Sequence, residues 1–164
     1  MADVVAVIGN PNPGGRTTRV AEAVATAIAS AAGPDSTTET IELAGLAPHL
    51  FEWGNEEVAA TRARVAAADV IVAACPTYKA SVSGLLKSFL DYYDNDGLAG
   101  RRAVPVMVGA APQHALAPEV HLRPVLVELG ASVPSRGLYV LESQIDDLDS
   151  VVGAWAFQAV PLLT

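Results

Sequence analysis

The stretch from Val4 to Ala32 most constrains how this chain can fold. A short apolar run, Val4–Ile8, stops at Gly9, and a loop of glycine, proline and asparagine then leads to Thr17 and Thr18, which open a long amphipathic segment. This order is typical of a strand, a tight loop and the first turn of a helix. Unpaired backbone N–H groups and the positive end of the helix dipole meet at such a junction. The stretch therefore predicts an anion-binding loop, with an ordinary glycine-rich turn as the alternative.

The loop also carries the residue types that a phosphate needs. Glycines let the backbone approach a ligand closely, and polar side chains around them can donate hydrogen bonds. These candidate donors are Asn10, Asn12, Arg16, Thr17 and Thr18. The spacing Gly9-x-x-x-x-Gly14 resembles a triphosphate loop, but no lysine follows at the required position, and the dinucleotide pattern G-x-G-x-x-G is absent. The loop therefore predicts a site for one phosphate, which fits a mononucleotide better than ATP or NAD.

The rest of the chain alternates between strand and helix patterns. Apolar or alternating runs predict strands at Val4–Ile8, Thr37–Leu43, Asp69–Cys75, Ala103–Ala110 and Gly137–Leu141. Helices are predicted at Thr17–Ala31, Glu56–Ala67, Ser83–Tyr93, Pro118–Leu129 and Val151–Val160, and residues 44–55 are predicted to form a loop. This alternation with short connections predicts an α/β fold, a doubly wound five-stranded parallel sheet with strand order 2-1-3-4-5 and helices on both faces. We expect residues 1–164 to form a single domain.

Three unusual loops follow the first, third and fourth predicted strands. They are Gly9–Thr18, Pro76–Ser83 and Gly109–His114. In the strand order 2-1-3-4-5 these loops converge at one edge of the sheet, beside the switch point between the first and third strands. The sequence therefore predicts a ligand site at this edge.

Composition narrows the classes of function. The formal net charge of −8 argues against a nucleic-acid partner or an anionic membrane surface. A single cysteine excludes an internal disulfide and fits a reducing, cytoplasmic setting. The N-terminus lacks the pattern of a signal peptide, and every apolar run is broken before it could span a bilayer. We expect a cytoplasmic protein.

The segment Cys75–Leu90, CPTYKASVSGLLKSFL, resembles the second flavin loop of the NAD(P)H-dependent FMN reductases, which typically reads T-P-x-Y-x-x-S-x-x-G-x-L-K. The matching residues are Pro76, Tyr78, Ser81, Gly84, Leu86 and Lys87. Residues 122–131 and Leu141–Ile145 resemble the branch of this family that supplies reduced flavin to alkanesulfonate monooxygenases. The resemblance implies a flavodoxin-like fold and hydride transfer from NAD(P)H to FMN.

The resemblance also implies roles for individual residues. The FMN phosphate would be held by the first-loop donors Asn10, Asn12, Arg16, Thr17 and Thr18. The edge of the isoalloxazine would be lined by Pro76, Thr77, Tyr78, Lys79 and Ser81, and the third loop would contribute Gly109, Ala110 and His114. No catalytic acid or base and no metal ligand is expected, because the flavin performs the redox chemistry.

Two loops depart from the family pattern. The first loop usually reads G-S-P-R, whereas this chain has Gly9-Asn10-Pro11-Asn12, without the hydroxyl and the cation. The third loop is usually rich in glycine, whereas here it reads Gly109-Ala110-Ala111-Pro112. We therefore expect FMN to bind weakly and to exchange, as a substrate does.

Several other residues have a simple structural interpretation. Cys75 is expected to be a buried small hydrophobe, and Trp53 an anchor of its loop. Because Pro124 lacks an N–H, we expect a kink or a π-bulge near Val120–His121, with His121 either exposed or at a subunit interface or flavin mouth. Acidic residues near the last helix are expected to form a solvated turn and helix cap: Asp146, Asp147 and Asp149.

The favoured function is that of an NAD(P)H:FMN oxidoreductase, a homodimer or homotetramer that supplies reduced flavin to a separate flavin-dependent monooxygenase. One alternative is a quinone, azo-dye or chromate reductase that holds FMN as a fixed prosthetic group. Another is a flavodoxin-like electron carrier without dehydrogenase activity. The residues leave the choice between NADH and NADPH open.

Overall fold

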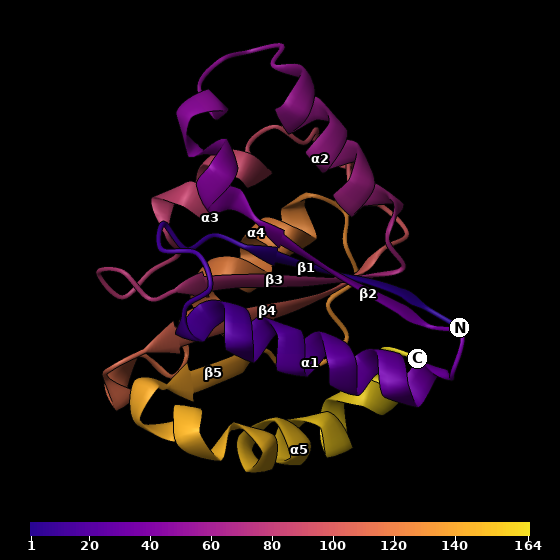
Figure 1. The fold of residues 1–164 in the computed structure, drawn as a ribbon, viewed down its shortest axis with the longest axis vertical. Helices are drawn as coiled ribbons and strands as arrows, with labels where there is room; N and C mark the ends of the chain where they lie inside the picture. The colour runs from indigo at the N-terminus through magenta and orange to yellow at the C-terminus, as the bar shows by residue number, and fades with distance from the viewer.

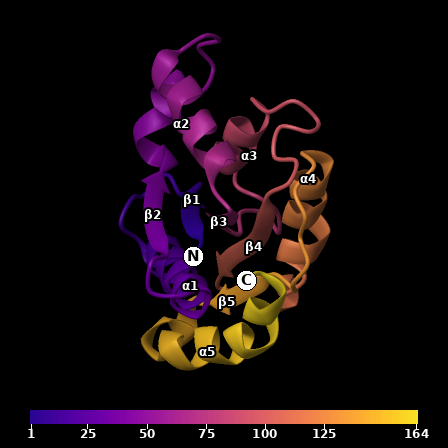
Figure 2. The ribbon, with the colours of Figure 1, turned by 90° about the vertical axis from the view of Figure 1, so that its right-hand side faces the viewer.

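Five parallel strands form the centre of the structure, a computed structural model that describes residues 1–164 (Figure 1). They are β1 (Asp3–Ile8), β2 (Thr37–Glu42), β3 (Val70–Pro76), β4 (Arg102–Gly109) and β5 (Leu138–Leu141). All neighbouring strands are parallel, and their order is β2-β1-β3-β4-β5. This order can be followed in Figure 2, and it confirms the predicted topology.

Helices cover both faces of the sheet, as predicted. They are α1 (Arg16–Ala32), α2 (Glu56–Ala67), α3 (Gly84–Leu90), α4 (Arg123–Glu128) and α5 (Leu148–Ala159). In Figure 1, α1 and α5 lie on one face, while α2, α3 and α4 lie on the other. None of these helices combines the length and the apolar character needed to cross a membrane.

The burial of each strand follows from its place in the sheet. Val4–Ile8 and Val70–Cys75 are buried throughout, because β1 and β3 are central and are covered on both faces. By contrast, β2 is an edge strand whose first four residues are exposed, as its alternating sequence predicted. The sheet thus divides two apolar cores, one against α1 and α5 and one against α2, α3 and α4.

Three predicted segments differ from the structure by more than one residue. The helix predicted to reach Tyr93 ends at Leu90, and the N–H groups of the two following tyrosines close tight turns onto the carbonyls of Phe89 and Leu90. The predicted loop 44–55 begins as a 3₁₀ helix, Leu43–His49. The last helix begins at Leu148, after another 3₁₀ segment that covers residues 142–147. Only in the first case do turns replace a predicted regular element; in the other two the structure is more helical than the sequence pattern suggested.

The predicted helix irregularity at Pro124 is confirmed. Residues Pro118–Leu122 form a π-helix, and the N–H of Arg123 bonds to the carbonyl of Pro118, five residues earlier. Because Pro124 offers no N–H to Val120, the helix absorbs one extra residue before it continues as α4. The Arg123 guanidinium then donates to Glu119 at 2.6 Å, and it also donates to two carbonyls of the segment that precedes β5. These bonds tie the π-helix to the segment that leads into β5.

Gly9, directly after β1, packs against Leu86 of α3, and this contact yields a stability prediction. A Cβ at position 9 would lie 2.3 Å from the Cβ of Leu86 and 2.8 Å from its Cα. We expect Gly9→Ala to lower the free energy of unfolding by about 1–3 kcal/mol in urea denaturation, because α3 would have to move. As a control, Gly153→Ala on the exposed side of α5, where no atom lies within 4 Å, should raise it by about 0.5–1 kcal/mol. Equal stability of Gly9→Ala and the wild type would contradict this packing.

Candidate functional site

The carboxyl ends of the strands meet at one edge of the sheet, where a cleft of about 390 Å³ opens. The cleft lies beside the switch point between β1 and β3, where ligands bind in open α/β sheets. It is lined by Asn10, Asn12, Gly15, Arg16, Thr17, Pro76, Tyr78, Val108 and Glu142. Six of these residues were predicted as site residues, and they come from both the first and the second loop.

The first loop is held in shape by the side chain of Asn10, which is 8% exposed. Its Oδ1 accepts a hydrogen bond from the backbone N–H of Asn12 at 3.1 Å, and its Nδ2 donates to the hydroxyl of Thr17 at 3.4 Å. This Asx-type turn folds the loop over the start of α1. The N-cap of α1 is Gly15, and no side chain caps the helix. The N–H groups of the first turn therefore remain available to an anion, and the helix dipole favours one.

A carboxylate braces the same loop from the outer side. One oxygen of Glu42, at the end of β2, accepts from the Thr18 hydroxyl at 2.7 Å and from the N–H of Gly14 at 2.8 Å. Thr18 is buried and does not line the cleft, so its hydroxyl serves the loop rather than the open site. This use of Glu42 was not predicted, because it depends on how β2 pairs with β1.

The second loop contains a strained turn. Tyr78 and Ser81 exchange two backbone hydrogen bonds, at 3.1 and 3.0 Å. Between them Lys79 and Ala80 both adopt the left-handed conformation, with φ of 51° and 64°. Such a pair is typical of a type I′ turn, where non-glycine residues cost roughly 1–2 kcal/mol each. The turn leaves Pro76 and Tyr78 on the cleft, whereas Lys79 and Ser81 do not line it.

Ser83 joins the second loop to the first. Its hydroxyl donates to the carbonyl of Gly9 at 2.6 Å and accepts from the N–H of Leu86 at 3.3 Å, so it also caps α3. The side chain is 1% exposed. Both loops are therefore fixed relative to each other by a buried hydrogen bond.

The third loop contributes less to the cleft than was predicted. Gly109, Ala110 and His114 do not line it, and Val108 at the end of β4 does. Gly109 is needed for close packing, because a Cβ there would lie 2.3 Å from the hydroxyl oxygen of Tyr139. That hydroxyl donates to the carbonyl of Ala111 at 2.8 Å. Thr77 likewise lies beside the cleft rather than on its lining, and its N–H bonds to Val108.

An ion pair spans the cleft between two distant parts of the chain. The guanidinium of Arg16 lies 3.2 Å from a carboxylate oxygen of Glu142, the residue that follows β5. These side chains are 57% and 39% exposed, and they are the only cation and the only carboxylate among the lining residues. Glu142 was not predicted as a site residue. The sequence feature that could have indicated Glu142 is its position directly after the last predicted strand, at the same sheet edge as the loops.

Comparison with known proteins fits this arrangement. Residues 2–146 match the family described as NADPH-dependent FMN reductase. The chain belongs to this family. Curated relatives named FMN reductase (NADPH) are 35% identical over 96 residues in Pseudomonas putida and 38% identical over 80 residues in Escherichia coli. The matched segments cover 58% and 49% of this chain, and 49% and 42% of those relatives, so the chain spans about half their length or less.

A solved structure described as the apo form of an NADH:FMN oxidoreductase superposes with a TM-score of 0.82 and 28% identity. The match covers 96% of this chain and 89% of that one. It confirms the flavodoxin-like fold that the strand order and the helix layers define for this FMN reductase family member.

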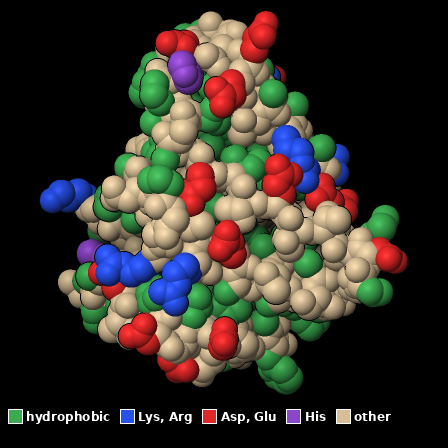
Figure 3. All heavy atoms as spheres, viewed as in Figure 1, with side chains coloured by type: hydrophobic (Ala, Val, Ile, Leu, Met, Phe, Trp, Pro, Cys, Tyr) green, Lys and Arg blue, Asp and Glu red, His purple; other side chains and the backbone are tan.

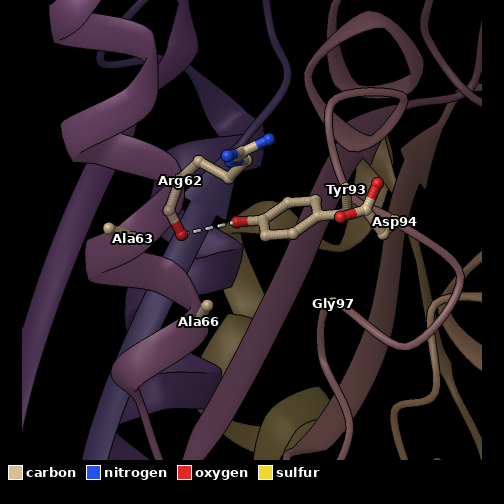
Figure 4. A pocket seen from close by; sticks show the side chains of 6 residues that line it. All are labelled: Arg62, Ala63, Ala66, Tyr93, Asp94 and Gly97. Carbon is tan, nitrogen blue, oxygen red and sulfur yellow. Dashed lines mark hydrogen bonds between the residues drawn. The ribbon is translucent and has the colours of Figure 1, made fainter.

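A second hollow, shown in Figure 4, lies between α2 and the turn that follows α3. Its volume is about 230 Å³, and the Tyr93 hydroxyl donates across it to the carbonyl of Arg62 at 2.9 Å. Burial raises the pKa of Tyr93 well above its ordinary value. This hollow is smaller and is not lined by the predicted anion loop, so the cleft at the sheet edge remains the candidate site.

Other groups with possible chemistry lie outside the cleft. No cluster of three or more acidic, histidine or cysteine side chains could hold a metal ion, so the acidic residues near α5 form no such site. His121 is exposed on the π-helix. Trp53 is 77% exposed, although its ring packs on Tyr92 with centroids 4.8 Å apart. On the face shown in Figure 3, acidic and basic side chains are interspersed without a continuous basic surface.

The burial of Cys75 predicts low thiol reactivity. This cysteine is 0% exposed, as the sequence suggested, and burial raises the pKa of its thiol from 9.0 to about 11. At pH 8 the native protein should react with a thiol reagent at least about 100-fold more slowly than the urea-unfolded chain, since far less thiolate is present and access is blocked. The unfolded chain, which should release one equivalent per chain, is the control. Comparable rates in the two states would show that Cys75 faces an open cavity.

Proposed function

We propose that this protein is an NAD(P)H-dependent FMN reductase, which transfers a hydride from the nicotinamide to FMN bound in the cleft at the sheet edge. One observation carries the proposal: the uncapped start of α1 and the Pro76–Tyr78 loop line one cleft at the switch point of the sheet. Membership of the family and the names of the relatives support it. Those names include both NADPH and NADH, so the proposal covers either coenzyme.

The residues of the cleft fit FMN in two parts. The free N–H groups at the start of α1, with Arg16 and the Thr17 hydroxyl, would hold the phosphate. Pro76 and Tyr78 would border the isoalloxazine, since the strained turn fixes them on the lining. The other predicted flavin contacts do not line the cleft itself, and their roles stay predictions: Thr77, Lys79, Ser81, Gly109, Ala110 and His114.

The protein's own part in the reaction is positioning. FMN, when bound, supplies the redox chemistry by accepting the hydride. The lining offers no histidine, and its one carboxylate is paired with Arg16, so no general acid or base is assigned. A rigid cleft that holds two rings in contact distance provides rate through orientation.

We further propose that the reduced flavin leaves for a separate flavin-dependent monooxygenase. The cleft supports this, because Tyr78 is 46% exposed at its rim and Arg16 is 57% exposed, so flavin could exchange with solvent. We also propose assembly into dimers or tetramers. Three exposed apolar side chains on and around the π-helix and α4 support such a contact: Leu116, Val120 and Val127.

Colour and turnover of the purified protein test the proposal. After extensive dialysis the protein should be colourless, and it should oxidise NAD(P)H only when FMN is added, because Asn10 and Asn12 stand where the resemblance implies a serine hydroxyl and an arginine. Retention of stoichiometric yellow flavin together with quinone turnover would instead indicate a quinone, azo-dye or chromate reductase. Absence of NAD(P)H oxidation with every flavin and quinone would leave only a non-catalytic electron carrier.

Two adjacent threonines provide a matched test of the site. Thr17→Val removes the hydroxyl of a residue that lines the cleft, which also accepts from the Asn10 amide, and it should raise the KM for FMN about two- to tenfold, the value of one hydrogen bond. Thr18→Val removes a hydroxyl that is bonded to Glu42 and does not line the cleft, so it should lower stability while leaving the KM nearly unchanged. Steady-state kinetics with FMN as the varied substrate would measure both. An equal change in the KM for FMN in both variants would mean that the phosphate does not bind beside Thr17.

A further inference from the structure

Two carboxylates approach the predicted phosphate loop from opposite sides. Glu42, from the end of β2, already occupies the N–H of Gly14 and the hydroxyl of Thr18. Glu142, after β5, holds the guanidinium of Arg16 at 3.2 Å. The donors of this loop are therefore partly engaged by the protein's own anions, although the loop has the geometry of an anion site.

The charge on the cleft lining is balanced before any ligand enters. Arg16 is the only cation there and Glu142 the only carboxylate. Because both side chains are well exposed, the ion pair is weak and can open easily. Its opening does not remove Glu142, however, which would still lie beside a phosphate that carries nearly two negative charges. The net charge of −8 on the chain adds to this repulsion.

A neutral flavin would not meet this obstacle. Riboflavin has the ring and the ribityl chain of FMN, but it ends in a hydroxyl instead of a phosphate. A hydroxyl can donate a hydrogen bond to a carboxylate such as Glu142, whereas a phosphate dianion can only repel it. The ion pair can then remain closed while such a ligand occupies the cleft.

We infer that Glu142 is a specificity-determining residue of this cleft, which cancels the advantage of the FMN phosphate so that riboflavin is accepted nearly as well as FMN. This inference rests on the proposed function, because it requires a flavin in the cleft. It concerns the selectivity between the two flavins and not the hydride transfer itself.

The dissociation constants of FMN and riboflavin test the inference, measured for the wild type, Glu142→Gln and Glu57→Gln. The wild type should prefer FMN by less than about tenfold. Glu142→Gln should bind FMN about tenfold more tightly, since no carboxylate then repels the phosphate or competes with it for Arg16, and should bind riboflavin no more tightly than the wild type does. Glu57 is exposed on α2 and does not line the cleft, so Glu57→Gln should remove one charge without changing the ratio of the two dissociation constants.

A double-mutant cycle separates Arg16 from a general change in the loop. Arg16→Gln should weaken FMN binding less than about threefold in the wild type, where Glu142 competes with the phosphate for the guanidinium, and about tenfold in the Glu142→Gln background, where nothing competes. The inference, but not the proposed function, would be overturned if the ratio of the dissociation constants of FMN and riboflavin were the same in Glu142→Gln as in the wild type. It would also be overturned if the wild type bound FMN more than about 100-fold more tightly than riboflavin. A protein that binds and reduces neither flavin would overturn the proposed function as well.

Discussion

The buried hydrogen bond from Ser83 to the carbonyl of Gly9 is the contact on which the arrangement of the candidate site depends. It joins the loop after β1 to the start of α3, and the N–H of Gly9 bonds in turn to the carbonyl of Ala74 on β3. The absence of a Cβ at Gly9 lets Leu86 pack directly on this point. Two loops that are far apart in the sequence are thereby fixed at one sheet edge, and the cleft forms between them.

The two loops hold conformations that are unfavourable by themselves, and the hydrogen bond from Ser83 to Gly9 helps to maintain them. The buried amide of Asn10 makes its hydrogen bonds within the first loop, and α1 begins without a side-chain cap. In the second loop Lys79 and Ala80 occupy left-handed conformations that glycine would adopt more easily. Strain and unpaired N–H groups at the same edge are unfavourable for folding alone, and they are understandable if the edge is built for a ligand.

The sequence revealed those features that depend on local pattern. Continuous apolar runs such as Asp69–Cys75 marked the central strands, and Pro124 marked the π-helix, because each leaves its cause in neighbouring residues. Tyr93 was wrongly included in the helix predicted from Ser83, because its aromatic ring continues the helical spacing of the apolar residues before it. In the structure its hydroxyl bonds to Arg62 on another helix. The position of Glu142 directly after the last predicted strand was visible in the sequence, but the pairing of Glu142 with Arg16 and of Glu42 with Thr18 could not be predicted, since each depends on side chains brought together by the whole sheet.

The electrostatics of the cleft connect the fold to its proposed use. A helix N-terminus attracts an anion, and a lysine or a free arginine beside it would make binding tight. Here Arg16 is paired with Glu142, and the Thr18 hydroxyl and the Gly14 N–H are paired with Glu42, so the first-turn N–H groups of α1 attract the anion without a free cation beside them. A prosthetic flavin needs tight binding, whereas a flavin that is reduced and then handed on must leave. The two glutamates therefore favour a site through which flavin passes over a site in which it stays.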